Sequence, residues 1–177
     1  MKKNIVLIGF MGVGKGTVAR ELSEKTGMFA VDCDDLIESR ANMKITKIFE
    51  VFGEERFREL ERQAAKWLEQ SVQSTVISTG GGFYKVANLR KIGKIVYLHG
   101  EFEATYQRLL ASDNAAKKIA KRPLLRDLEK ARKLHAERVP LYRRLADLEV
   151  DVIGRSADDI CERICTELKI KQKVNKS

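Results

Sequence analysis

Cysteine and histidine are scarce in this sequence, which has three cysteines and two histidines among 177 residues. Cys33, Cys161 and Cys165 are an odd number and lack the paired spacing of a zinc site. This pattern argues against a disulfide framework and a structural metal site, and it favours buried, reduced thiols in the cytosol. His99 and His135 have no partner residues in the sequence, so neither is assigned a role.

Long hydrophobic runs are also missing. No stretch approaches the roughly 20 apolar residues that a membrane-spanning helix needs. The N-terminus places Lys2 and Lys3 before an apolar run, as a signal peptide does. Glycines interrupt this run, however, and it stops at Lys15 with no small-residue cleavage motif after it. We therefore expect a cytoplasmic protein with no membrane partner.

Aromatic residues make up only 7% of the chain and are not interleaved with the basic ones, although the formal net charge is +9. Excess positive charge suits nucleic acid, a membrane surface or small anionic ligands. A nucleic-acid surface usually adds aromatic side chains to the basic ones, so no nucleic-acid partner is expected. Part of the charge lies in residues 169–177, which carry four lysines and no acid. Residues 171–177 are expected to form a solvated basic tail.

Strand and helix patterns alternate along the chain. Strands are predicted at Ile5–Ile8, Phe29–Asp32, Thr75–Ser78, Lys94–Leu98 and Val150–Ile153. Helices are predicted at Lys15–Thr26, from Asp35, and at Ile45–Phe52, Glu54–Gln70, Phe102–Leu110 and Asp158–Ile170. The alternation predicts an α/β fold, a three-layer sandwich with a five-stranded parallel sheet covered by helices on both faces. The length of 177 residues suits a single domain over 1–177.

Two segments depart from this alternation. Residues 33–62 are predicted to be all helical between two strands, which suggests a small helical lobe at the sheet edge. Residues 111–126 are polar and basic and suggest a lid. Pro140 predicts a break or kink in the helical stretch that follows. Apolar residues recur at helical spacing in the lobe and beyond it, at Ile45, Ile48, Phe49 and Phe52, and as an inner stripe at Phe57, Leu60, Ala64, Trp67 and Leu68.

The most informative motif follows the first predicted strand. Gly9-x4-Gly14-Lys15 is the pattern of a nucleotide phosphate-binding loop, in which glycines let successive backbone N–H groups point at one anion. The N-terminus of the next helix adds unpaired donors and its dipole. The Ser or Thr that usually follows the lysine is Gly16 here, and a hydroxyl comes one place later at Thr17. The structural alternative is a glycine-rich turn with a solvated Lys15.

Acidic residues and glycines follow two further strands. Because ligands of open α/β sheets bind beyond the carboxyl ends of the strands, the phosphate loop, the Asp32–Asp34 pair and Gly80–Gly82 are expected to line one cleft. One aspartate can face the phosphates and their metal, and the other can orient the phosphate acceptor and take its proton. Alternatively, Asp34 or Asp35 caps the next helix. Three consecutive glycines predict a sharp turn or a close approach to a ligand.

Arginines are candidates for holding an anion. Arg58 lies one turn before Glu61, which could hold the guanidinium for a bidentate grip on a carboxylate. A solvated ion pair is the alternative. Arg122 lies in the basic segment, where a closing lid would bring it to the phosphates. Further candidates, before and after Pro140, are Arg138, Arg143 and Arg144.

Taken together, these residues resemble the shikimate kinase family over nearly the whole chain. The matching segments are Gly9 to Lys15, Asp32 to Glu38, Phe52-Gly-Glu54 with Phe57, Arg58 and Glu61, Gly80–Gly82, Arg122-Pro-Leu-Leu and Arg138-Val-Pro-Leu-Tyr-Arg143. The resemblance implies a fold of the P-loop NTPase type. It also implies transfer of the ATP γ-phosphate to the 3-hydroxyl of shikimate, a step toward chorismate and aromatic amino acids, with Mg²⁺ as cofactor.

The resemblance implies a role for each matched residue. The catalytic residues would be Lys15, Asp34 and Arg122. Shikimate would be bound by Asp34, which contacts its hydroxyls, by Arg58 and Arg138, which hold its carboxylate, and by Gly80, Gly81 and Gly82. ATP would be bound by Gly12, Val13, Gly14, Lys15, Gly16, Thr17, Arg108, Arg122 and Arg155. Mg²⁺ would be held by Asp32, through water, and by Thr17.

Gly16 departs from the family, which usually has a Ser or Thr there as a Mg²⁺ ligand. Gly-Lys-Gly-Thr is the adenylate kinase form of the loop. Two alternatives therefore stay open: another small-molecule or nucleoside monophosphate kinase of the same fold, and a nucleotide-binding module without turnover. The glycine triplet and the aspartate pair favour a polyol acid as the acceptor. The protein is expected to act as a monomer on shikimate and ATP.

Overall fold

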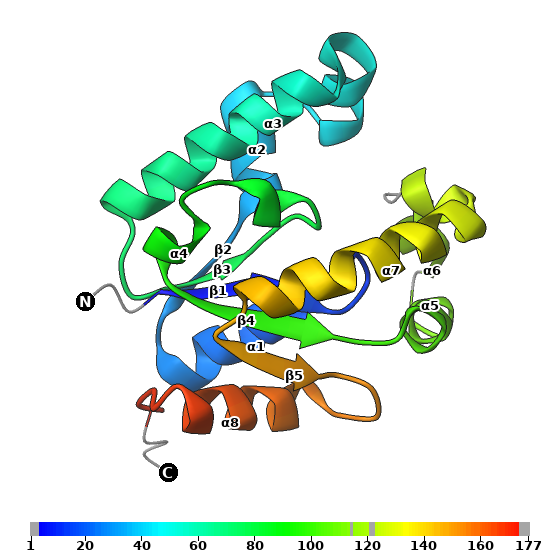
Figure 1. Cartoon of the computed structure of the whole chain (residues 1–177). Coiled ribbons are helices and arrows are strands. Elements are labelled where there is room, and N and C mark those ends of the chain that lie inside the picture. Colours follow the sequence, from blue (N-terminus) through cyan, green and yellow to red (C-terminus); the bar gives the residue numbers. More distant parts are fainter. Residues whose placement is uncertain (1–3, 114, 121–122, 174–177) are drawn as a thin grey trace.

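The computed structural model describes residues 4–113, 115–120 and 123–173, and its central element is one parallel sheet (Figure 1). The strands are β1 Ile5–Ile8, β2 Phe29–Asp32, β3 Thr75–Ser78, β4 Lys94–His99 and β5 Leu148–Asp151, in the spatial order β2-β3-β1-β4-β5. Each predicted strand is present, and only the last is shifted, by two residues. The five-stranded parallel sheet is therefore confirmed.

Helices cover both faces of the sheet. They are α1 Lys15–Thr26, α2 Cys33–Ala41, α3 Ile45–Ser71, α4 Leu89–Ile92, α5 Phe102–Leu110, α6 Ala115–Ala120, α7 Leu128–Leu145 and α8 Ala157–Glu167, with 3-10 turns η1 Phe83–Lys85 and η2 Pro123–Arg126. Figure 1 shows α1 and α8 on one side and α3, α4 and α7 on the other. Alternate residues of β1 belong to different cores, Ile5 and Leu7 facing α1 and α8, Val6 and Ile8 facing the other layer. The predicted three-layer sandwich is confirmed.

Helix α3 contains a break that the sequence predicts. The expected helices over Ile45–Phe52 and Glu54–Gln70 are both present, and Gly53 joins them with φ 75° and ψ 179°. A positive φ is costly for residues other than glycine. Gly53 therefore lets the chain turn between the two halves.

Of the break or kink expected near Pro140, the break is absent. Helix α7 runs through Pro140 to Leu145, although proline removes a backbone hydrogen bond. Buried side chains hold the helix on both sides of the proline, with His135 and Arg138 before it and Tyr142 after it. We attribute the unbroken helix to these tertiary contacts.

The lobe formed by α2 and the part of α3 on either side of Gly53 has a small core of its own. Ile37, Ile48, Phe57 and Leu60 cluster there. Three other aromatic side chains at helical spacing are exposed, however: Phe49, Phe52 (56%) and Trp67. Figure 1 shows the N-terminal part of α3, which carries Phe49 and Phe52, projecting beyond the sheet. Trp67 lies near the other end of α3, beside Ala65 and Leu68 of the main core, but its own side chain points away from that core. The inward orientation predicted for Trp67 is wrong.

Four smaller expectations concern the lid segment, the basic tail, the cysteines and a membrane-spanning helix. The segment predicted as a lid contains α6 and η2, and Leu125 at its end is buried in the main core. In the described part of the tail, the Lys173 N–H donates to the Lys25 carbonyl (2.7 Å). All three cysteines are buried free thiols. Within the described ranges, no helix is long and apolar enough to cross a membrane.

Candidate active site

The loop after β1 has the backbone of a phosphate-binding loop. Gly9, Gly12 and Gly14 have φ values of 146°, 84° and 100°, which side chains other than glycine's rarely allow. A β-carbon on Gly9 would also lie 2.5 Å from the Leu98 carbonyl oxygen. Gly14 is the N-cap residue of α1, so the loop leads directly into the helix N-terminus. The glycines thus shape a cradle of the kind that binds phosphate.

Lys15 is folded over this loop. It is the first residue of α1 and is buried. Its Nζ donates to the carbonyl oxygens of Gly9 (2.8 Å) and Phe10 (2.9 Å). The alternative of a solvated Lys15 is therefore wrong, and its positive charge lies at the mouth of the loop.

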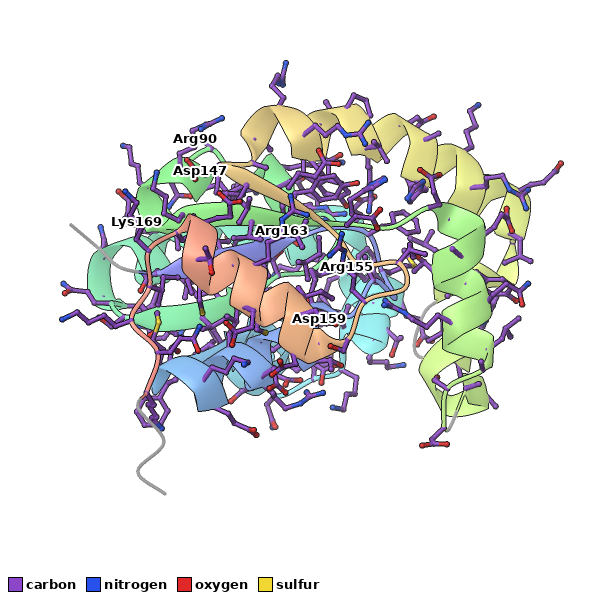
Figure 2. All side chains as sticks on the ribbon, turned by 90° about the horizontal axis from the view of Figure 1, so that it is seen from below. Arg90, Asp147, Arg155, Asp159, Arg163 and Lys169 are labelled. Atoms are coloured by element: carbon purple, nitrogen blue, oxygen red, sulfur yellow. The ribbon has the colours of Figure 1, made fainter. Side chains whose placement is uncertain are left out.

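Arg108 on α5 also contacts the loop backbone, whereas Arg155 lies on a turn. The Arg108 Nη2 donates to the Val13 carbonyl (2.7 Å) and, more weakly, to the Gly12 carbonyl (3.4 Å). Burial lowers the pKa of its guanidinium. Arg155 is exposed on the turn between β5 and α8, shortly before Asp159 on α8 (Figure 2). Arg122 lies outside the described residues.

The two aspartates after β2 have different environments. Asp32 caps α2, since its Oδ1 accepts the Asp34 N–H (2.9 Å), and its Oδ2 accepts the Ser78 hydroxyl (2.8 Å). The alternative in which Asp34 or Asp35 caps the helix is therefore wrong. Burial and the neighbouring Asp32 charge raise the pKa of Asp34 to about 6, while Lys15 acts in the opposite direction. Asp34 thus remains available for chemistry, with a pKa near neutrality.

The glycine triplet after β3 is the place where the other site residues meet. A β-carbon on Gly80 would lie 2.7 Å from the Asp34 Oδ1, and one on Gly82 would overlap the Arg58 guanidinium. The Gly81 carbonyl accepts hydrogen bonds from Arg138 and from a tyrosine on α7. The close approach predicted for this triplet is confirmed, because side chains from α2, α3 and α7 pack directly on its backbone.

Arg58 is held on two sides by carboxylates. Its Nε (3.0 Å) and Nη2 (2.8 Å) donate to the Glu54 Oε1, and its Nη1 donates to the Glu61 Oε2 (2.6 Å). The side chain of Glu61 is only 2% exposed and that of Arg58 19%. Burial raises the pKa of Glu61, and Arg58 opposes that rise. The alternative of a solvated surface pair is wrong: the guanidinium is fixed in place.

Arg138 has one buried nitrogen without a partner. Its Nη1 donates to the Gly81 carbonyl (3.0 Å), and its guanidinium lies near the rings of Phe10 (5.9 Å) and Tyr84 (5.8 Å). Among the described residues, nothing accepts a hydrogen bond from Arg138 Nε, and Glu61 Oε1 is likewise unpaired. An unpaired buried polar group costs about 1–3 kcal/mol. A ligand oxygen that reached Arg138 Nε would remove this cost.

Two other arginines suggested by the sequence are not part of the site. Arg143 pairs with Glu149 (3.0 Å), and the Arg144 carbonyl accepts from Arg90 (2.9 Å). Figure 2 shows Arg90 near Asp147, just before β5 begins. This is the amino end of the strands, opposite the phosphate loop.

Two site residues received no role from the sequence. They are Glu54, which holds Arg58, and Tyr142, whose hydroxyl donates to the Gly81 carbonyl. Their spacing is a usable signal, since each lies four residues from an arginine of the site and so shares its helix face.

The donors near the loop suit a magnesium ion that is bound mainly by nucleotide and water. Asp32 offers a carboxylate, and Thr17 is exposed in the first turn of α1. Within the described ranges, no group of three or more His, Cys, Asp or Glu side chains forms a metal cage. Mg²⁺ typically keeps several waters and binds through one or two carboxylates together with substrate phosphates. The residues present fit that mode.

One pocket lies apart from these residues. It has a volume of about 560 Å³ and is lined by Arg40, Ala41, Met43, Ile48, Phe52, Arg56, Leu60 and Gln63. None of the residues predicted for the site lines it, so it is not the cleft beyond the strand ends.

A phosphate loop beside an acid, a buried arginine and a half-buried arginine defines a P-loop kinase with a small anionic acceptor. Comparisons agree with this class. The model of the shikimate kinase family matches residues 11–169. The chain belongs to the shikimate kinase family and is an enzyme of that family.

Individual relatives cover most of the chain. The shikimate kinase of Helicobacter hepaticus is 40% identical over 142 residues, 80% of this chain and 82% of the relative. That of Francisella tularensis subsp. holarctica is 37% identical over 94% of each chain. Among solved structures, shikimate kinase from Acinetobacter baumannii in complex with shikimate has a TM-score of 0.83 at 34% identity, covering 98% of this chain and 97% of that chain. The Aquifex aeolicus enzyme has a TM-score of 0.77 at 32% identity, covering 94% of this chain and 96% of that one.

Proposed function

We propose that this enzyme transfers the γ-phosphoryl group of ATP to the 3-hydroxyl of shikimate, giving shikimate 3-phosphate and ADP on the route to chorismate and aromatic amino acids. The observation that carries the proposal is the convergence of Asp34, Arg58 and Arg138 on Gly80–Gly82, one strand away from the phosphate loop. Membership of the family and the shikimate complex of the Acinetobacter relative support the acceptor.

The arginines hold the carboxylate of shikimate. Arg138 Nε is a buried donor without a partner, and Arg58 is fixed by Glu54 and Glu61 with one guanidinium face toward Gly82. A carboxylate that bridges the two guanidinium groups forms charge-assisted hydrogen bonds. This contact orients the ring so that a hydroxyl reaches Asp34.

Asp34 acts on the hydroxyl. With a pKa near 6, its carboxyl group is ionised at neutral pH and can accept a proton. The hydroxyl oxygen bonds to the γ-phosphorus, the bond from this phosphorus to the ADP oxygen breaks, and the hydroxyl proton passes to Asp34. Lys15 stabilises the negative charge on the transferring group, because its Nζ already lies over the loop.

The remaining roles complete the proposal. Mg²⁺, held by Asp32 through water and by Thr17 or water, would neutralise phosphate charge when bound. Arg108 and Arg155 flank the nucleotide. Residues 111–126 close as a lid that brings Arg122 to the phosphates.

The organisation of the protein belongs to the same proposal. Residues 1–177 form one shikimate kinase domain in which 33–62 is the substrate-binding lobe. The protein acts as a monomer in the cytosol, and the three free thiols support a reducing compartment.

The test is ADP release with Mg²⁺ and ATP, measured with shikimate, gluconate or AMP as the acceptor. We expect turnover that depends on shikimate and on Mg²⁺, with far less for the other two. Preference for AMP would favour a nucleoside monophosphate kinase. ATP hydrolysis at the same rate without shikimate would contradict the proposal.

A further inference from the structure

We propose that Tyr142 is a positioning residue for shikimate: its hydroxyl fixes the Gly81 carbonyl and so keeps the Arg138 guanidinium available for the substrate carboxylate. The inference rests on the proposed function, which assigns no role to Tyr142. It concerns a hydroxyl group rather than the tyrosine ring.

The hydroxyl and the guanidinium share one acceptor. Tyr142 Oη donates to the Gly81 carbonyl oxygen at 2.6 Å, and Arg138 Nη1 donates to the same oxygen at 3.0 Å. A carbonyl oxygen has two lone pairs, so these two donors saturate it. Without the hydroxyl, the oxygen can accept a second N–H from Arg138. The guanidinium would then turn toward the Gly81 carbonyl, and its unpaired Nε would move from the position in which we propose that it meets the substrate carboxylate.

The same hydrogen bond acts on the neighbouring peptide group. The Gly81 carbonyl and the Gly82 N–H belong to one planar trans peptide, so they point in opposite directions. Holding the oxygen toward α7 therefore fixes the direction of the Gly82 N–H. Gly82 also packs on the Arg58 guanidinium. Through the peptide group between Gly81 and Gly82, Tyr142 thus affects the positions of both Arg138 and Arg58.

The hydroxyl is a permanent donor at this position. Tyr142 is 1% exposed, and burial raises its pKa to about 12, so it stays protonated at any working pH. Its ring packs on Tyr84 and Tyr97, with centroids 5.2 Å apart in each case. The ring contributes to the core, and only the hydroxyl reaches Gly81. The two contributions can therefore be separated by removing one oxygen atom.

Tyr142→Phe makes this change, and Tyr97→Phe is its matched control. Tyr97 is equally buried in the same aromatic cluster, but its hydroxyl shares a hydrogen bond with His99 Nδ1 (2.9 Å) and not with the glycine triplet. Both variants lose one buried hydroxyl group. The measurements are KM for shikimate and for ATP, the Kd of shikimate by calorimetry, and the melting temperature.

For Tyr142→Phe we expect the KM and Kd for shikimate to rise about 3- to 10-fold, the range of one lost hydrogen bond. The KM for ATP should stay within about twofold, and Tyr97→Phe should leave all three constants within about twofold, by the same reasoning. Partial unfolding would raise the apparent constants for shikimate and ATP alike, so it cannot produce a rise for shikimate alone.

Several outcomes would overturn the inference. They are an unchanged shikimate affinity in Tyr142→Phe, equal losses for shikimate and ATP, or the same loss in Tyr97→Phe. Failure of the proposed function has a different signature, since the wild-type protein would then show no shikimate-dependent turnover. Calorimetry measures the Kd of shikimate for both variants without turnover, so it detects the effect of Tyr142→Phe even if the enzyme is inactive.

Discussion

The nucleotide half of the site and the acceptor half differ in how their polar groups are satisfied. In the nucleotide half, Lys15 and Arg108 donate to carbonyl oxygens of the loop itself. In the acceptor half, Arg138 Nε and Glu61 Oε1 are buried without hydrogen-bond partners among the described residues. Burial also raises the pKa of Asp34 in this half.

This difference suggests separate roles for the two halves. In the nucleotide half, hydrogen bonds within the protein satisfy the carbonyl groups of the loop, so the loop is expected to keep its conformation without nucleotide. The acceptor half contains charges that the fold buries at a cost and that a carboxylate and a hydroxyl would compensate. Specificity for the acceptor is therefore expected to come from the acceptor half. Substitutions that remove its buried charges should make the protein more stable and the enzyme less active.

The largest effect should come from Asp34→Asn. Loss of the proton acceptor is expected to lower kcat by about 10³-fold, within the usual range of general-base catalysis. In the wild type, kcat/KM should rise with pH through about 6, as the Asp34 carboxyl group of the free enzyme ionises. Steady-state rates between pH 5 and 8 test both statements. A variant that keeps more than a tenth of the activity would contradict the role.

The same substitution should make the protein more stable at neutral pH. The folded pKa of Asp34, about 6, lies above the ordinary value of an unfolded aspartate, so the folded state binds more protons in the interval between them. Its contribution to stability is thus lost as pH rises through that window. We expect Asp34→Asn to gain about 1–2 kcal/mol at pH 7, allowing for partial exposure. Urea unfolding at pH 4 and 7 tests this, and an equal difference at both pH values would count against it.

Lys15→Ala probes the nucleotide half. We expect a fall in kcat of at least about 10²-fold, since a preorganised charge at the transferring phosphate is lost. The fold should persist, because the loop glycines and α1 keep their packing. Lys47→Ala, at an exposed lysine paired with Glu50, is the control. Activity of Lys15→Ala within about tenfold of wild type, or about 1.4 kcal/mol of barrier, would show that the assigned role is wrong.

Arg58→Lys probes the acceptor half without leaving Glu61 unpaired. Lysine keeps the charge but not the planar fork of donors, so the KM for shikimate should rise about tenfold while that for ATP changes little. Arg56→Lys, on the same helix and paired with Glu59, is the matched control. Equal losses of affinity for both substrates would indicate a purely structural Arg58.

Gly16→Ser should give the smallest effect. A β-carbon there would meet only the Arg20 Nη1, at 3.7 Å, so serine fits without strain. An added hydroxyl ligand should lower the Mg²⁺ concentration for half-maximal rate by about twofold, because water already substitutes at modest cost. Replacing glycine in a helix can also add up to about 1 kcal/mol of stability, so thermal melts must be measured separately. Identical Mg²⁺ curves would mean that Thr17 or water already completes the site.

Predictions from the sequence succeeded where the signal is local. The strands and the Gly53 break follow from short patterns of branched residues and glycine. Packing overrides the pattern at two other places: α7 continues through Pro140 without the break that was one of the two expectations there, and Trp67 is exposed although its spacing predicts an inward position. Helical spacing identifies a face, but only the neighbouring elements decide whether that face is covered.

The sequence by itself determined the nucleotide half, because Gly9, Gly14 and Lys15 lie in one short segment whose backbone depends on its glycines. It also indicated which residue types would meet an acceptor. Only the tertiary structure decided that Asp32 caps α2 while Asp34 stays available, that Arg58 is half-buried and paired with two glutamates, and that Tyr142 reaches Gly81. The physical reason is distance along the chain: the acceptor half joins four segments whose burial and hydrogen bonding exist only after the sheet and its helices have packed.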